Sequence, residues 1–288
     1  MSAIFKREFR SYMHNATGFV FLAVLLLVAG LLCVALNVIL GSARFEDSLY
    51  YLQIALIIVI PLLTMRTMTE EKRLHTDQLL YSLPLPLWKI VLGKYLAMVA
   101  VFGIGCGVIA LYPLLFGLFG MTGMGTAYSS IFGFFLLGAA LIAFCTFFSC
   151  MAESPLIAMI LCVVATGVLF CVDMFVALLS VVGAVGSLIS LVALALLVAL
   201  VVWLLTRHAV ITAAVAVVGV LPQVLVFAIN SALYDGLLYR VVSTLSLFYR
   251  FSVFTRGIFD ITTIIYDISF AALFLFLTYQ ALEKRRWS

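Results

Sequence analysis

Residues 19–36 read FVFLAVLLLVAGLLCVAL, a run of 18 residues without a charge. A helix needs about 20 apolar residues, rising about 1.5 Å each, to cross the roughly 30 Å hydrocarbon core of a bilayer. Three basic residues, Lys6, Arg7 and Arg10, precede the run, as they would in a signal peptide. The run is longer than the apolar part of a signal peptide and no small-residue cleavage site follows it, so it predicts a retained membrane span.

The whole chain shares this composition. Of its 288 residues, 66% are apolar and 10% are charged, against about half and about a quarter in soluble domains. A soluble enzyme is therefore disfavoured. The formal net charge of +4 is too small for nucleic-acid binding and instead indicates which loops are cytoplasmic. The six cysteines lie in or at the end of apolar runs without metal-ligand spacing, so we expect small buried side chains.

Eight runs are long and apolar enough to span a membrane: 17–40, 49–65, 95–119, 128–151, 156–180, 187–206, 209–230 and 264–282. The break between the fifth and sixth is only a glycine-containing turn, so six or seven spans remain alternatives. The sequence thus predicts an all-α polytopic membrane helix bundle, one domain over residues 1–288, with eight transmembrane helices or, alternatively, six.

Basic residues mark the cytoplasmic loops. With eight spans and the amino terminus inside, all four basic clusters fall on one side, around Lys6, between residues 66 and 94, at Arg207 and at residues 284–286. Both termini are therefore expected in the cytoplasm.

The amino-terminal segment, residues 1–16, is predicted to be an interfacial helix. Its apolar residues Ile4, Phe5, Phe9 and Tyr12 fall on one helical side, opposite the basic residues. A frayed basic tail is the alternative.

Residues 66–94 form the most informative predicted loop. Thr76, Leu79, Leu80 and Leu83 follow the spacing i, i+3, i+4 and i+7 after the acidic and basic run EEKR at 70–73, and Pro84 ends the pattern. The pattern predicts a short helix with an apolar docking stripe. The alternative is a solvated loop with no partner.

Several separated motifs resemble, in order, the type-2 ABC exporter permease family, including permeases associated with gliding motility and copper-enzyme maturation. They are FKREFRSY at 5–12, the EEKR, LL and WKIVLGK segments of the 66–94 loop, residues 257–267 and LEKRRW at 282–287. The sequence departs from that family at His75, at Gln78 and in two additional spans within 183–230.

The resemblance implies that the 66–94 loop is a cytoplasmic coupling loop that contacts a separate ABC ATPase subunit. Leu79, Leu80 and Leu83 would fill a groove on the ATPase, and Glu70, Glu71 and Arg73 would set specificity at its rim. The coupling residues expected on this basis are Glu70, Glu71, Arg73, Thr76, Leu79, Leu80 and Leu83. The family also implies a homodimer or a second permease subunit.

Residues 231–263 are polar enough to leave the bilayer yet rich in Leu and Phe, which predicts an outer interfacial or re-entrant segment. The family places short outer helices here, so Tyr249, Arg250, Arg256 and Asp260 are candidates for the outer end of an export path. Arg256 and Asp260, four residues apart, could pair across one helical turn; an ordinary surface pair is the alternative.

Candidate chemistry inside the spans is sparse. The ionisable residues there are Asp173 and Asp267, with Glu153 at a boundary, and Asp173 is either an outer cap or a buried polar group. The chain has no nucleotide-binding, metal-binding or catalytic motif, so it is expected to be no enzyme and to hold no cofactor. Gly103 and Gly107 are spaced for close helix packing.

The expected function is that of the multi-pass permease subunit of an ATP-driven exporter in the bacterial cytoplasmic membrane, with an unidentified substrate. An ion-gradient-driven secondary transporter and a non-transporting membrane assembly factor are the alternatives.

Overall fold

The computed structural model describes residues 2–42, 44–70, 87–117, 123–179 and 237–287, with a few single positions between 186 and 227. Within these residues the secondary structure is helical, without strands. The chain divides into two units, which are treated separately below. Unit 1 comprises Met1–Phe170 with Arg250–Ser288, and unit 2 comprises Cys171–Tyr249.

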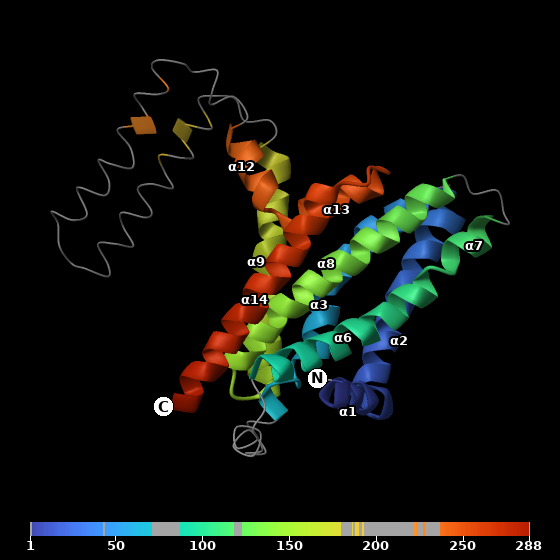
Figure 1. The fold of residues 1–288 in the computed structure, drawn as a ribbon. Coiled ribbons are helices and arrows are strands. Elements are labelled where there is room, and N and C mark those ends of the chain that lie inside the picture. The colour runs from blue at the N-terminus through green and yellow to red at the C-terminus, as the bar shows by residue number, and fades with distance from the viewer. Residues whose placement is uncertain are drawn as a thin grey trace. The chain divides into compact units, whose positions relative to one another are not determined.

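Figure 1 shows the order of the helices along the chain. Their bounds are α1 Ser2–His14, α2 Ala16–Cys33 with the π-helix η1 Val34–Ile39, α3 Phe45–Thr64, α6 Leu87–Ile109, α7 Tyr112–Gly117, α8 Met124–Met151, α9 Pro155–Leu179, α12 Leu237–Leu245, α13 Leu247–Thr255 and α14 Ile261–Trp287.

Six of the described helical segments are long and apolar enough to cross a membrane, which makes this a multi-pass membrane protein. They are Ala16–Ile39, Phe45–Thr64, Leu87–Gly117, Met124–Met151, Pro155–Val176 and Ile261–Lys284. Each corresponds to one predicted span. The predicted spans at 187–206 and 209–230 lie outside the described residues except for a few single positions, so the choice between six and eight is not decided by the described part of the chain.

All six described spans begin earlier than the sequence predicts, and two of them thereby include a charged residue that a neighbouring group satisfies. The third predicted span, at 95–119, starts at Leu87 and so includes Lys94, which the sequence placed in the loop. The second, at 49–65, starts at Phe45 and includes Glu46, which is only 2% exposed. The Oγ1 atom of Thr126, in the first turn of α8, donates a hydrogen bond to the Glu46 carboxylate.

Helix α8 is the centre of unit 1. It packs against α3, α6 and α14, and 72% of its span window is buried, against 22% for α2 and for α14. Close approach to α6 depends on Gly138, where a Cβ atom would lie 2.1 Å from the Phe102 ring. Phe102 also contacts Phe134 of α8 at 5.7 Å between ring centroids. Phe102 packed against Gly138 and Phe134 is therefore part of the contact between α6 and α8.

The predicted glycine pair of α6 is not where its closest packing occurs. A Cβ atom at Gly103 would lie 3.4 Å from the Phe135 ring of α8, an ordinary contact, and one at Gly107 would meet nothing within 4 Å. A Cβ atom at Gly105, between the two, would lie 2.7 Å from Leu25 of α2. Spacing alone could not distinguish the glycine that faces α2 from those on the other sides of α6.

Helix α3 contains Pro61, which has no N–H group and leaves the carbonyl oxygen of Ile57 without its helical donor. In a bilayer such a group must be satisfied within the protein. The Oγ1 atom of Thr166, in α9, lies 3.3 Å from the Ile57 oxygen and 2.8 Å from the carbonyl oxygen of Cys162 in its own helix, so its one proton is shared between these acceptors. A threonine on a neighbouring helix thus partly compensates for the proline.

One end of unit 1 collects the end of α3, the start of α6, the end of α8 and the end of α14. Met68, Val91, Cys150 and Leu282 pack together there, and Ile4 of α1 contacts α6 at Gly93. At this end, called the loop end, the described chain stops at Glu70 and resumes at Leu87. Helix α1 and the end of α14 are therefore at the same end of unit 1.

At the opposite end of unit 1, α2 finishes as a π-helix, in which the N–H of Leu40 donates to the carbonyl oxygen of Ala35 at 3.1 Å. The side chain of Asn37 lies in this segment. Its Nδ2 donates to the carbonyl oxygens of Ser42 and Arg44, and its Oδ1 accepts from Ser48 Oγ at 2.6 Å. One amide side chain thereby fixes the turn from α2 into α3.

In unit 2, α12 ends at Leu245 and α13 begins at Leu247. Ser246 separates them, and its Oγ accepts a hydrogen bond from the N–H of Tyr249 at 3.2 Å, as in a helix N-cap. Part of the predicted outer segment, 231–263, is therefore two short helices.

Candidate functional site

Polar side chains from three helices meet at the carboxyl end of α3, within the loop end of unit 1. A helix ends with carbonyl groups that have no donor in the helix itself. Here the carbonyl oxygens of Leu63, Thr64 and Thr67 each accept a hydrogen bond from a side chain of a different helix. We call these three carbonyls and their donors the carbonyl hub; the donors are Tyr12 of α1, Ser149 of α8 and Lys94 of α6.

The three hydrogen bonds of the hub are buried. Tyr12 Oη lies 3.4 Å from the Leu63 oxygen and 2.7 Å from Thr67 Oγ1. Ser149 Oγ lies 3.1 Å from the Thr64 oxygen. The hub therefore attaches the carboxyl end of α3, from which the chain continues toward Glu70, to three other helices.

Lys94 is the cation of the hub. Its side chain is 1% exposed, and its Nζ donates to the Thr67 carbonyl oxygen at 2.7 Å. A cation that donates to carbonyls beyond the end of a helix also interacts favourably with the helix dipole. A hydrogen bond to a charged group is stronger than one between neutral groups, with a net worth of about 1.5–3 kcal/mol.

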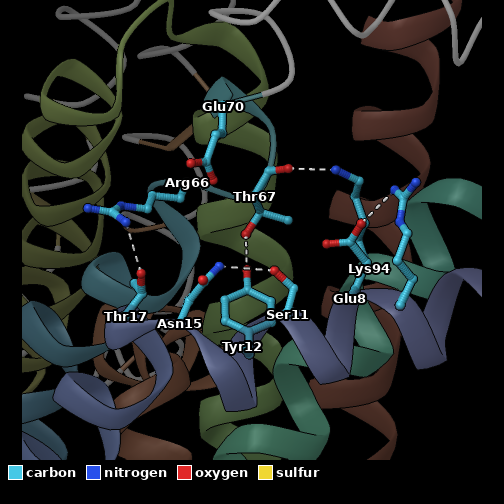
Figure 2. A pocket seen from close by; sticks show the side chains of 10 residues that line it. Glu8, Ser11, Tyr12, Asn15, Thr17, Arg66, Thr67, Glu70 and Lys94 are labelled. Carbon is cyan, nitrogen blue, oxygen red and sulfur yellow. Dashed lines mark hydrogen bonds and ion pairs between the residues drawn. The ribbon is translucent and has the colours of Figure 1, made fainter.

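A polar cavity of about 270 Å³ lies beside the hub, between α1, the start of α2, the end of α3 and α6. Figure 2 shows its lining. The charged residues around it are Arg7, Glu8, Arg66, Glu70 and Lys94, and the neutral polar ones are Ser11, Tyr12, Asn15, Thr17 and Thr67.

Hydrogen bonds across the cavity hold several of these side chains in place. Arg66 Nη1 donates to Thr17 Oγ1 at 3.1 Å, and Asn15 Nδ2 donates to Ser11 Oγ at 3.1 Å. Arg7 forms an ion pair with Glu8 at 2.8 Å.

Helix α1, the predicted interfacial helix, forms one wall of the cavity. It turns directly into α2, with so little space that a Cβ atom at Gly18 would lie 2.1 Å from the carbonyl oxygen of Tyr12. Tyr12 is buried and Ile4 packs on α6, while Lys6, Arg7 and Arg10 are exposed. The basic side therefore faces outward from the bundle and the side with Ile4 and Tyr12 faces inward.

Of the predicted coupling residues, only Glu70 lies in the described part. It is exposed, lines the cavity, and its N–H donates to the carbonyl oxygen of Arg66 at 3.2 Å. The others lie outside the described residues: Glu71, Arg73, Thr76, Leu79, Leu80 and Leu83. The loop predicted over 66–94 is shortened at its far end, because α6 begins at Leu87.

The predicted outer residues are not brought together as a helical pair. Helix α13 ends at Thr255 and α14 begins at Ile261, so Arg256 and Asp260 lie in the turn between them, with Gly257 at φ 79°. Asp260 instead caps α14, accepting from the Thr262 N–H and the Thr263 hydroxyl at 2.9 Å each. Hydrogen bonds from Thr262 and Thr263 lower the pKa of Asp260 below its usual range.

Tyr249 and Arg250, the other two candidates, are described in different units. In unit 2, the ring and hydroxyl of Tyr249 contact those of Tyr239. In unit 1, the guanidinium of Arg250 lies 4.2 Å from the centroid of the Tyr266 ring.

Asp267 is the most buried acidic side chain of α14, at 4% exposure, and its Oδ1 has no hydrogen-bond partner among the described residues. Arg250 is close enough to interact with it electrostatically. Ionisable groups held inside a membrane protein are rare and commonly functional. Asp173, in unit 2, lies inside α9 rather than at its end, is half-buried, and its Oδ1 is 3.5 Å from Ser246 Oγ.

The donors of the hub were not predicted. Tyr12 was assigned to the apolar side of α1, Lys94 to the loop and Ser149 to an apolar run. The available signal was a lysine and a serine inside stretches that otherwise read as membrane spans, since such polar groups require partners.

Comparison of the chain with family models, with curated proteins and with solved structures found no match.

Proposed function

We propose that this protein is the membrane-spanning permease subunit of an ATP-driven exporter, moved by a separate ATPase subunit that contacts residues 70–83. It would act as a homodimer or with a second permease in a bacterial cytoplasmic membrane, on a substrate not specified by the sequence. The observation that carries the proposal is the carbonyl hub, because it connects the end of α3, which leads into the proposed contact segment, to three helices.

The mechanical argument starts from what an external subunit can move. A segment between two spans transmits a push to the end of the first span and the start of the second. Without further contacts, only those ends would shift. The bonds from Tyr12, Ser149 and Lys94 tie the end of α3 to α1, α8 and α6, so a displacement of that end displaces packed helices together, as rigid-body switching requires.

The position of residues 70–83 relative to the membrane is the first test. Single cysteines placed in 70–83 are treated in intact cells with a membrane-impermeant thiol reagent, in a Cys171→Ser background because Cys171 is the exposed native cysteine. We expect labelling only after the cells are permeabilised. Labelling in intact cells would refute the proposal.

The second test measures the complex. The chain is co-expressed with candidate ATPase subunits encoded beside it, and the complex is purified. The triple variant L79D/L80D/L83D is expected to abolish association, whereas L79M/L80M/L83M, which keeps the apolar stripe, is expected to preserve it. If the complex still forms with the aspartate substitutions, residues 79–83 are not part of the contact with the ATPase.

One observation favours a second candidate, an ion-gradient-driven transporter. Asp267, buried in a span beside Arg250, is a group of the kind that binds a proton or cation in such transporters. Proteoliposomes of the chain alone, enclosing a pH-sensitive dye, distinguish the two functions. A proton flux that Asp267→Asn abolishes would favour the ion-driven transporter, and the absence of flux would favour the ATP-driven one.

A further inference from the structure

The polar cavity beside the carbonyl hub has a position and a charge that the coupling role does not require. We propose that it is a binding site for the phosphate group of an anionic phospholipid, seated between α1, the end of α3 and α6. The inference does not depend on the identity of the ATPase or of the exported substrate.

The depth of the cavity is the first argument. Thr17 is the second residue of the span Ala16–Ile39, and Thr67 lies three residues beyond the span Phe45–Thr64. Lys94 lies seven residues into its span, about 10 Å at 1.5 Å per residue, but its Nζ extends to the Thr67 carbonyl. This is the snorkelling of a lysine toward the headgroup region. The cavity therefore lies at the level of lipid phosphates.

The charge of the lining is the second argument. Three cations and two carboxylates surround the cavity, and one of the carboxylates, Glu8, is engaged by Arg7 at 2.8 Å. The hydrogen bonds of Arg66 and Lys94 shown in Figure 2 go to neutral oxygens, Thr17 Oγ1 and the Thr67 carbonyl. Basic pockets between membrane helices bind lipid headgroups in this way.

The shape and surroundings are the third argument. A volume of about 270 Å³ far exceeds the roughly 10–15 Å³ that one water molecule needs, and hydroxyl and amide groups in its wall can donate to phosphate oxygens. A second hollow adjoins it along α1, shares Arg7 and Ser11, and adds Lys6, Arg10 and His14. A headgroup entering from the membrane surface would thus pass along a basic face.

The binding test uses the full chain in a neutral detergent, with dioleoyl phosphatidylglycerol as the anionic probe and dioleoyl phosphatidylcholine as the zwitterionic one. Lipid adducts are measured by native mass spectrometry and by the shift of the unfolding temperature. We expect phosphatidylglycerol to bind more tightly and to stabilise the protein, since anionic lipid gains about 1 kcal/mol per nearby cation, or roughly fivefold.

Three variants connect the binding to this cavity. Arg66→Gln should weaken phosphatidylglycerol binding about fivefold or more, whereas Lys89→Gln, which removes a half-buried cation on α6 that is not in the lining, should leave it unchanged. Glu70→Gln removes a negative charge from the lining and should tighten binding. A gain of affinity cannot arise from misfolding, so this variant keeps the test valid if Arg66→Gln is unstable.

The outcomes separate the sources of the phosphate. Millimolar inorganic phosphate that stabilises the protein and displaces the lipid, with loss of both effects in Arg66→Gln, would assign the site to a soluble phosphate and overturn the lipid assignment. Equal binding of the two lipids would overturn the site itself. So would phosphatidylglycerol binding that is unchanged in both Arg66→Gln and Glu70→Gln.

Discussion

Replacing Tyr12 by phenylalanine tests the carbonyl hub with a single atom. The ring is buried, so phenylalanine keeps the packing of α1 against its neighbours and removes only the hydroxyl. That hydroxyl lies 2.7 Å from Thr67 Oγ1 and 3.4 Å from the Leu63 carbonyl oxygen.

The expected cost follows from what each partner loses. A buried hydrogen bond is worth about 0.5–1.5 kcal/mol net, and a buried group left without a partner costs about 1–3 kcal/mol. Thr67 Oγ1 also lies 3.1 Å from the sulfur of Met98 and so retains one contact. The 3.4 Å bond to Leu63 is long. We therefore expect about 1 kcal/mol, which is a roughly fivefold increase in the opening of α1 from the bundle.

Hydrogen exchange of the α1 amides, measured in detergent micelles, reports this opening. The matched control is Tyr128→Phe, which removes a 3.3 Å bond to the Ala110 carbonyl from a side chain 39% exposed and should change exchange in α1 by nothing measurable. Unchanged exchange in Tyr12→Phe, or the same change in both variants, would refute the hub as the attachment of α1.

Three other predictions concern the bundle and can be measured as unfolding temperatures in detergent. Gly138→Val should cost about 1–3 kcal/mol because its Cβ would lie 2.1 Å from Phe102, while Gly107→Ala, with open space around it, should be tolerated. Asp260→Ala should cost about 0.5–2 kcal/mol through loss of the α14 cap; because the folded pKa of Asp260 is lowered, its contribution is present above about pH 4 and is lost as the pH falls through that lower value. Thr166→Val should destabilise the protein by about 1 kcal/mol, and less in a Pro61→Ala background, where the helix supplies its own donor; equal costs in both backgrounds would contradict the compensation of Pro61.

The sequence predicted the six spans of the described part because apolar length is a property of each segment alone. It failed on boundaries where a charge is satisfied by a distant partner. Glu46 and Lys94 seemed to lie outside the membrane spans, but Thr126 and the Thr67 carbonyl accommodate them inside helices. Such partners lie 80 and 27 positions away along the chain, beyond the range of any periodicity.

The candidate site was predictable only in part for the same reason. The amphipathic character of α1 was correctly predicted, since Lys6 and Arg10 are exposed and Tyr12 is buried. That Tyr12 would reach the end of α3 depends on the tight turn at Asn15, between α1 and α2, which a glycine at position 18 permits. Spacing does not specify the direction of that turn. The one-turn pairing of Arg256 with Asp260 was wrong because it assumed a continuous helix. The helix is interrupted between Thr255 and Ile261, where Gly257 has a positive φ.

The π-helix at Val34–Ile39 has a consequence for how homologous sequences should be aligned with this one. A π-turn accommodates one residue more than an α-turn. A homologue shorter by one residue in this segment could therefore wind as α-helix as far as the bend at Leu40 and preserve the contacts of Ala16–Cys33, which precede it. The same deletion earlier in α2 would rotate everything after it by about 100°. Single-residue gaps between Ala16 and Ile39 should thus concentrate within the six positions of η1.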